Sequence, residues 1–214
     1  MTQPSHDARQ TVEDALAGRV EASRGAMSPL VEALRELGAI DRAVYRTVAD
    51  TPTPLLDGPF RRLSRAADHS RVWLGIATAI AAVGGGRGRR VALEGVLAIG
   101  VTSATVNLGW KPLARRRRPE STAAVVTRRV PTPESLSFPS GHAASAFAFA
   151  YAVSRHLPAM AVPIRLLAGA VAYSRVHTGV HYPGDVLIGS ILGAGTAAMV
   201  AAAWDRIGSR PPRR

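Results

Sequence analysis

Long apolar segments constrain this chain more than any other feature. Between Val72 and Trp204, runs of Ala, Val, Leu, Ile and Gly are separated only by short breaks rich in Arg, Gly or Pro, whereas residues 1–70 are mixed and charged. Runs of this kind fit either a buried soluble bundle or helices that cross a lipid bilayer. Because the runs carry few charges and follow one another almost continuously, we expect an all-α fold built as a membrane-embedded helical bundle.

The breaks divide the apolar region into five core helices. A segment with the letters GGGRGRR follows the first of them, and we interpret it as a basic turn between helices, because no strand precedes it as a phosphate-binding glycine loop requires. The last helix contains Gly189 and Gly193, a small-xxx-small spacing that lets helices approach closely. The five helices are expected over residues 72–83, 91–110, 142–154, 160–174 and 186–204.

The rest of the chain is expected to surround this bundle. Apolar residues recur at helical spacing at Leu30, Leu34, Leu37 and Ile40, which is typical of an amphipathic helix. The first residues are polar and acidic, which argues against a signal peptide. The predicted organisation is a flexible N-terminal segment (1–25), amphipathic peripheral helices (26–71), a bundle (72–204) and a basic tail (205–214).

Charge narrows the classes of partner. The net charge is +12, Lys111 is the only lysine, and the absence of cysteine excludes disulfides and thiolate metal sites. Basic chains bind nucleic acid, anionic lipid or phosphorylated substrates. Aromatic residues make up only 5% of the chain and no basic patch is interleaved with stacking side chains, so we expect no nucleic acid partner. A membrane and a lipid phosphate substrate are the expected partners, and the sequence does not indicate an oligomeric state.

Three polar clusters interrupt the apolar helices. The second predicted helix ends at the first cluster, the third helix begins at the second cluster, and the fourth helix ends at the third cluster. Two crossings separate the second cluster from the third, so helix order alone places all three on one face of the bundle. The clusters are Lys111 to Pro119, Pro139-Ser140-Gly141-His142, and Ser174 to Asp185.

Residue types on this face match the needs of phosphoryl transfer. Guanidinium groups pair with phosphate oxygens in a bidentate way, and backbone N–H groups at a helix start favour an anion. One histidine can attack phosphorus while another protonates the leaving oxygen. Asp185 lies four residues after His181, so its carboxylate can fix the tautomer of that ring. The face therefore predicts a phosphatase site.

The three clusters read K-x6-RP, PSGH and SR-x5-H-x3-D, and this pattern resembles the type 2 phosphatidic acid phosphatase (PAP2) and vanadium haloperoxidase superfamily. The chain is similar to its lipid phosphatase branch, and to the phosphatase half of bacterial proteins fused to a diacylglycerol kinase-like domain. The resemblance implies hydrolysis through a phosphohistidine intermediate without a metal or cofactor. It implies catalytic roles for His181 (nucleophile), Asp185 (orienting group) and His142 (general acid), and phosphate binding by Lys111, Arg118, Ser140, Gly141 and Arg175.

Other polar residues receive simpler interpretations. His177 does not match the pattern, and we expect it to play a hydrogen-bonded structural role. Arg115, Arg116 and Arg117 are interpreted as a basic run that faces solvent or lipid headgroups, and Arg128 and Arg129 as residues able to touch a headgroup.

Two alternatives and two open questions remain at this stage. The same cradle could hold vanadate in a haloperoxidase-like enzyme, or the chain could bind lipid without turnover. Phosphatidic acid, phosphatidylglycerol phosphate and polyprenyl phosphates or diphosphates all fit a basic cradle beside lipid. The expected location is the cell membrane, with several crossings. The resemblance favours an active-site face outside the cytoplasm. Arginines occur on both faces of the predicted bundle, so the positive-inside rule does not decide its orientation.

Overall fold

The computed structural model describes residues 29–119, 128–131 and 135–208, and within these ranges the regular elements are helices. The chain divides into two compact units, residues 1–42 and 43–214. The predicted flexible segment 1–25 and most of the basic tail lie outside the described residues. The helices are α2 (Pro29–Asp50), α3 (Pro54–Ala66), α4 (Arg71–Val83), α5 (Gly85–Ala104), α6 (Lys111–Ala114), α7 (Gly141–His156), α8 (Ala161–His177) and α9 (Pro183–Gly208).

The described part of the first unit is the beginning of α2. The apolar side chains of Leu30, Leu34, Leu37 and Ile40 recur on one side of this helix and are exposed. Three charged residues, Glu32, Arg35 and Glu36, stand at positions between them. The amphipathic helix predicted from this spacing is therefore present.

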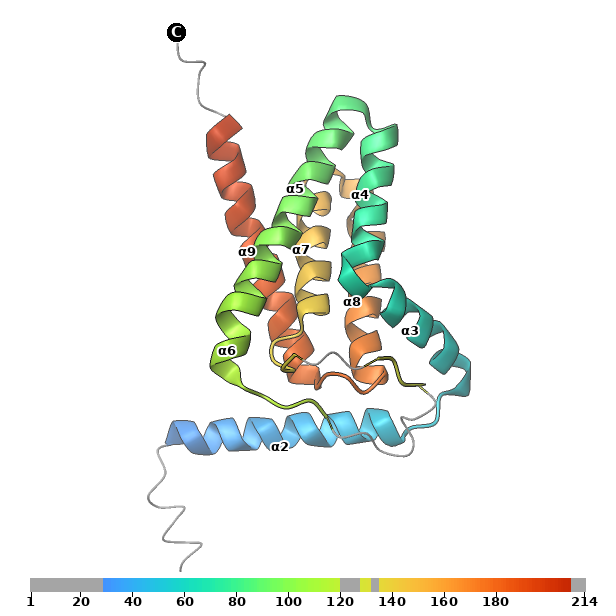
Figure 1. The fold of residues 1–214 in the computed structure, drawn as a ribbon, viewed down its shortest axis with the longest axis vertical. Coiled ribbons are helices and arrows are strands. Elements are labelled where there is room, and N and C mark those ends of the chain that lie inside the picture. Colours follow the sequence, from blue (N-terminus) through green and yellow to red (C-terminus); the bar gives the residue numbers. More distant parts are fainter. Residues whose placement is uncertain (1–28, 120–127, 132–134, 209–214) are drawn as a thin grey trace, which may run out of the picture. The chain divides into compact units, whose positions relative to one another are not determined.

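Helix α7 is the central element of the second unit and packs against α5, α8 and α9 (Figure 1). Six alanines of α7 are buried, together with Phe149 and Val153. Small side chains allow the neighbouring helices to come close, and the ring of Phe149 fills the space that Gly95 leaves on α5. The expected bundle of five core helices is confirmed as α4, α5, α7, α8 and α9.

The turn between α4 and α5 is shorter than the sequence predicted. Helix α4 ends at Val83 and α5 begins at Gly85, so most of the GGGRGRR segment forms the first turns of α5 rather than a loop. A Cβ on Gly84 would lie 2.7 Å from the Cα of Gly88, and Gly85 has φ +57°. Gly84 and Gly88 thus approach each other where a side chain would not fit, and Gly85 supplies the left-handed conformation that reverses the chain.

A buried ion cluster stabilises the end of the bundle that is remote from the predicted site. Glu94 of α5 is fully buried, and its two carboxylate oxygens lie 3.0 Å from Arg155 Nη1 and 2.8 Å from His156 Nε2. Arg155 also pairs with Asp205 of α9 at 2.7 Å. A buried carboxylate needs such partners, and here they join α5, α7 and α9.

Three helical segments of the described chain have the length and apolar composition needed to cross a membrane: Gly85–Ala114, Pro158–His177 and Pro183–Arg206. The other two core helices, α4 and α7, have 13 and 16 residues, fewer than the ~20 that a perpendicular crossing requires. Apolar side chains such as Leu97, Leu166 and Ile191 are exposed on the bundle surface. This surface is that of a membrane protein.

Candidate active site

The structure brings the eight predicted site residues to one end of the bundle. Helices α5 and α8 end there, and α7 and α9 begin there (Figure 1). The order of the helices is the reason, as the sequence predicted. Lys111 lies in α6, Arg118 in the segment after it, Ser140 to His142 at the start of α7, Arg175 in the last turn of α8, and His181 and Asp185 where α8 connects to α9.

A pocket of about 190 Å³ opens between these residues. Five predicted residues line it: Lys111, Arg118, Gly141, His142 and His181. Arg175, Asp185 and Ser140 do not line the pocket, and each of them contacts a residue that does or lies next to one. The remaining lining residues are Ala67, His69, Ser70, Trp73, Ser103, Asn107, Ser135 and Ser145.

His181 is held from two sides. Its Nδ1 lies 3.5 Å from Asp185 Oδ2, an ion-pair contact longer than a good hydrogen bond, and its Nε2 lies 3.3 Å from Arg118 Nη1. Asp185 is itself fixed, because Oδ1 pairs with Arg116 Nη1 at 2.9 Å and Oδ2 accepts the backbone N–H of Tyr182. The carboxylate therefore favours the Nδ1–H tautomer and leaves Nε2 directed into the pocket as the free base.

Burial controls the protonation of His181. Desolvation is the main cause that lowers the pKa of His181 from 6.5 to about 4, and Arg118 and Arg175 act in the same direction, while Asp185 opposes them. An imidazole with this pKa is unprotonated at neutral pH, so its lone pair is available for attack.

The lowered pKa predicts a pH-dependent stability. Below about pH 6.5 the unfolded chain protonates His181 while the folded chain does not, so the free energy of unfolding falls as pH decreases towards 4. We expect the thermal midpoint of the detergent-solubilised protein to decrease from pH 7 to pH 4.5 more steeply than that of His181→Ala. Parallel slopes for the two proteins would show that His181 does not carry this linkage.

Arg118 and Lys111 form the basic wall of the pocket. Arg118 donates from Nη1 to the backbone oxygen of Val180 at 2.7 Å and from Nε to that of Ser135 at 2.9 Å. Lys111 Nζ donates to Ser135 Oγ at 3.1 Å. Ser135 thus contacts both cations, and Arg118 lies beside His181.

Arg175 lies behind the pocket and is only 1% exposed. Its Nη1 donates to the hydroxyl and the backbone oxygen of Ser64 and lies 3.6 Å from Asp68 Oδ1. Within the described residues, its Nε and Nη2 have no hydrogen-bond partner. Buried donors without partners cost free energy, which a bound anion would recover.

The start of α7 is fixed by its own contacts. Ser140 caps the helix, with its hydroxyl accepting the N–H of Ala143 at 3.5 Å, and its backbone N–H donates to the carbonyl oxygen of Asp185 at 2.9 Å. Ser140 itself does not line the pocket, whereas Gly141 does. His142, the next residue, bonds through Nε2 to Asp68 Oδ1 at 2.9 Å.

Sequence reasoning missed several contacts around the site. Arg116 was interpreted as part of a solvent-facing run, yet it pairs with Asp185 and stacks 4.1 Å from the centre of the Tyr182 ring. Arg128 was assigned to a headgroup, yet it is buried, pairs with Asp57 at 3.0 Å and donates to the backbone oxygens of Val48 and Thr51. No motif marks either residue among its neighbouring arginines.

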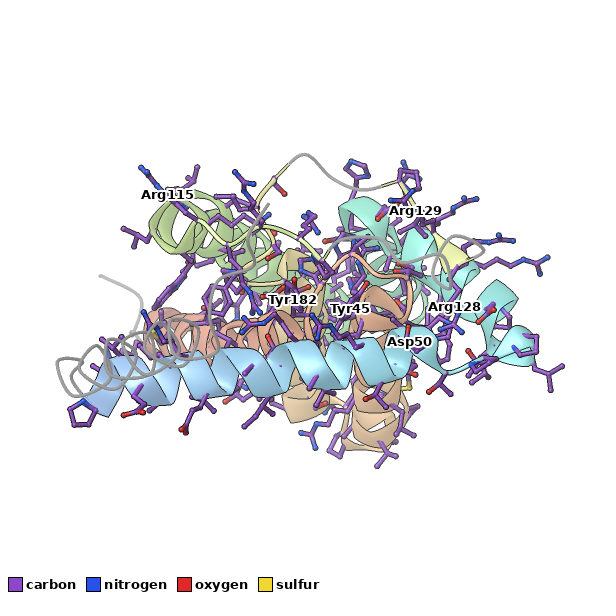
Figure 2. The ribbon with its side chains drawn as sticks, turned by 90° about the horizontal axis from the view of Figure 1, so that it is seen from below. Tyr45, Asp50, Arg115, Arg128, Arg129 and Tyr182 are labelled. Atoms are coloured by element: carbon purple, nitrogen blue, oxygen red, sulfur yellow. The ribbon has the colours of Figure 1, made fainter. Side chains whose placement is uncertain are left out.

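The segment around Arg128 and Tyr182 also fixes the end of α2. The rings of Tyr45 and Tyr182 meet edge to face with centres 5.4 Å apart, and Figure 2 shows them side by side. His177, predicted to be structural, pairs through Nε2 with Asp57 at 3.1 Å and is buried against Phe60. This layer holds the loop between α8 and α9 in place without lining the pocket.

A pocket lined by the buried, unprotonated His181, by His142 and by two cations, with the buried guanidinium group of Arg175 close to it, lies at the end of a membrane bundle. This arrangement defines an enzyme that transfers phosphoryl groups of lipids. The chain belongs to the PAP2 superfamily, whose pattern matches residues 91–208. It is 38% identical over 166 residues to the decaprenylphosphoryl-5-phosphoribose phosphatase of Mycobacterium tuberculosis, an alignment that covers 76% of this chain and 87% of the relative. The corresponding phosphatase of Mycolicibacterium smegmatis is 36% identical over 74% of this chain and 83% of its own.

Two solved structures share the fold. Aquifex aeolicus LpxE aligns with a TM-score of 0.63 at 21% identity and covers 75% of this chain and 93% of its own. The PAP2-type phosphatidylglycerolphosphate phosphatase of Bacillus subtilis aligns with a TM-score of 0.63 at 22% identity and covers 94% and 98%. Together with the family match, the relatives identify this chain as a phosphoric ester hydrolase that acts on lipid phosphates through a phosphohistidine.

Proposed function

We propose that this enzyme removes the terminal phosphate from a phosphorylated sugar carried by a polyprenyl phosphate, the class of substrate named in its mycobacterial relatives. The observation that carries the proposal is the composition of the pocket. Besides the cations and His181, hydroxyl and amide side chains line the pocket, and we call them the sugar wall: Ser70, Ser103, Asn107 and Ser145. A sugar offers hydroxyl groups to such a wall, whereas a diacylglycerol offers esters and hydrocarbon.

In the proposed reaction the eight site residues divide the work. Lys111, Arg118 and the Gly141 N–H bind the phosphate oxygens. The Nε and Nη2 donors of Arg175, which have no partner among the described residues, add positive charge on the side of the phosphate where Arg175 lies. Nε2 of His181 attacks phosphorus, and Asp185 stabilises the imidazolium that forms. Ser140 supports this arrangement by joining the start of α7 to Asp185 through its backbone N–H.

Proton transfer falls to His142. As the bond between phosphorus and the leaving oxygen breaks, protonated His142 gives its proton to that oxygen. The resulting neutral ring then takes a proton from the water that attacks the phosphohistidine, which restores both histidines and releases phosphate.

The test is phosphate release by the purified full chain in detergent, with EDTA present. The panel contains a short-chain polyprenylphosphoryl ribose 5-phosphate, phosphatidic acid, phosphatidylglycerol phosphate and a polyprenyl diphosphate, each with wild type and His181→Ala. We expect the ribose 5-phosphate substrate to give the highest kcat/KM. A higher value for any other member, with the same dependence on His181, would assign the enzyme to that substrate class instead.

Asn107 offers a sharper test of the sugar wall. It lies in a π-helical segment, Thr105–Trp110, and its amide Nδ2 donates to the backbone oxygen of Ser103 at 2.9 Å. Such segments are frequent at functional sites. We expect Asn107→Leu to lower kcat/KM about 5- to 10-fold for the ribose substrate, the effect of one neutral hydrogen bond, and to leave phosphatidic acid unaffected.

Leu108 provides the matched control for this variant. It belongs to the same π-helical segment but is 80% exposed and does not line the pocket. Leu108→Ala is expected to change neither substrate's kcat/KM. An equal loss for both substrates in Asn107→Leu would mean that Asn107 shapes the pocket without recognising hydroxyl groups.

The location of the enzyme follows from the same proposal. We place residues 72–204 across the cell membrane as the multi-pass bundle, with residues 26–71 at its periphery, residues 1–25 and 205–214 as the ends, and the pocket outside the cytoplasm. Three spans of sufficient length and the exposed apolar side chains of the core helices support this placement. Labelling of a cysteine introduced at Leu113, which is 79% exposed beside the pocket, with a membrane-impermeant maleimide in intact cells would test the face.

A further inference from the structure

One carboxylate outside the three sequence clusters contacts the catalytic pocket. Asp68 lies in a short 3-10 helix, Asp68–Ser70, between α3 and α4. Its Oδ1 is 2.9 Å from His142 Nε2 of α7 and 3.6 Å from Arg175 Nη1 of α8. The residue thus joins three elements at the wall of the pocket where His142 lies.

The backbone beside Asp68 is held in an unusual conformation. His69 and Ser70 have φ angles of 55° and 59°, in the left-handed region that residues with a Cβ seldom adopt. Both residues line the pocket. Strained backbone of this kind persists where the surrounding structure fixes it, and it concentrates at functional sites. The turn delivers the Asp68 carboxylate to His142 at the cost of local strain.

Asp68 is the anionic group in contact with His142. The hydrogen bond from His142 is the main cause that holds the pKa of Asp68 below its ordinary value, with Arg175 acting in the same direction against partial burial. Burial is the main cause that lowers the pKa of His142, and the cations Arg175 and Arg118 act in the same direction, whereas Asp68 raises that pKa. Lys111 and His181 line the same pocket.

We propose that Asp68 is a positioning residue that orients the general acid His142 and keeps it protonated for departure of the leaving group. This inference rests on the proposed function. Since Nε2 of His142 is bonded to Asp68, Nδ1 is the nitrogen that gives its proton to the leaving oxygen. The carboxylate opposes the effects of burial and of the two guanidinium groups nearby, and so favours the imidazolium beside the phosphate-binding cations.

The contribution of Asp68 to the rate should depend on whether the leaving group needs a proton, and this difference provides the test. Departure of an alkoxide from a lipid or sugar phosphate needs a proton, whereas departure of p-nitrophenolate does not. We expect Asp68→Asn, which keeps the shape and a hydrogen bond but removes the charge, to lower kcat on the order of 10- to 100-fold for the alkyl phosphate, part of what a general acid supplies. Turnover of p-nitrophenyl phosphate should change less than about 3-fold.

The alkyl substrate should also reveal a change in pH dependence. Without the carboxylate, the alkaline limb of kcat/KM is expected to move to lower pH, because the imidazolium loses its anionic partner while Arg175 and Arg118 remain. Asp68→Glu, which restores the charge at a shifted position, should bring the limb back towards that of the wild type even if kcat stays low. A residue that merely stabilised the fold would move neither quantity selectively.

Asp57 provides a matched control elsewhere in the same unit. Its Oδ1 lies 3.1 Å from His177 Nε2, so it forms an aspartate–histidine pair of similar geometry, yet neither residue lines the pocket. Asp57→Asn is expected to show no selectivity between the two substrates. Turnover of p-nitrophenyl phosphate by each variant reports that the protein is folded.

The outcomes separate the inference from the function on which it rests. An equal loss on both substrates in Asp68→Asn, or no loss on either, would overturn the role of Asp68. If Asp68→Asn does not fold, the neutral variant Asp68→Ala takes its place, and an alkaline limb that is the same in Asp68→Glu as in Asp68→Ala would overturn the role of Asp68. Hydrolysis that survives in His181→Ala would instead overturn the proposed function.

Discussion

Replacement of His181 by alanine is expected to reduce phosphate release on the order of 10⁴-fold or more. The loss should appear in kcat, because the substitution removes the nucleophile while Lys111, Arg118 and Arg175 still bind phosphate. Unlike Asp68→Asn, this variant should fail equally with alkyl and aryl phosphates, since both must be attacked by the same nitrogen. Rates measured under single-turnover conditions, together with the KM, check this expectation.

The phosphohistidine itself can be observed. After rapid mixing of enzyme with ³²P-labelled substrate and quenching in base, label should remain on the wild-type chain and be lost on acid treatment, as expected for a phosphorus–nitrogen bond. His142→Ala should accumulate this label with p-nitrophenyl phosphate, because the first step then needs no acid while the attacking water has lost its base. The far-end histidine variant His156→Gln should label like the wild type. Label that persists in His181→Ala would assign the nucleophile to another residue.

That the eight candidate residues lie at one end of the bundle could be predicted from the sequence, because their positions depend on helix order and on three local motifs. Helices α5 and α8 had to end, and α7 to begin, at the same side of the bundle once the apolar runs were recognised. The contacts of Asp185 with Tyr182 and of Ser140 with Ala143 are local in sequence and follow from the same motifs.

Asp68 and Arg116 could not be predicted in the same way, because their partners lie far away in the chain. Asp68 reaches His142 across 74 positions and Arg116 reaches Asp185 across 69. A single carboxylate before a short apolar helix belongs to no repeating sequence pattern that would predict its partner. Which of the neighbouring arginines reaches Asp185 depends on the backbone at Arg115. There α6 ends in a left-handed conformation with φ 45°, and the chain changes direction. The π-helical segment that contains Asn107 likewise has no sequence pattern that marks it.

The small-xxx-small spacing of Gly189 and Gly193 indicated from the sequence that α9 packs closely against another helix. Substitution at one of these glycines is expected to have the largest effect on stability. On α9, an added Cβ at Gly193 would lie 2.0 Å from the carbonyl oxygen of Ala144 on α7 and 2.7 Å from its carbonyl carbon. At Gly189 it would lie 2.5 Å from the backbone oxygen of Ser140. The two glycines therefore bring α9 into backbone contact with the first turns of α7, where the proposed catalytic residues of both helices lie.

Gly193→Ala is expected to lower the free energy of unfolding by about 3 kcal/mol or more, because the overlap is with backbone that cannot rotate away as a side chain can. Gly195→Ala is the matched control: a Cβ there meets nothing within 4 Å. The control should be neutral or up to about 1 kcal/mol more stable, since alanine favours the helix over glycine. Thermal midpoints of the two variants in the same detergent measure the difference.

Activity should follow stability in this pair of variants for a geometric reason. Helix α7 carries His142 at its start and α9 carries Asp185, so a shift of one helix against the other separates the proposed general acid from the group proposed to orient the nucleophile. Any Gly193→Ala protein that folds should therefore lose kcat for alkyl and aryl phosphates alike, whereas Gly195→Ala should retain both. Equal midpoints and equal rates for the two variants would mean that α7 and α9 can separate without cost, and that close approach at Gly193 does not hold the active site together.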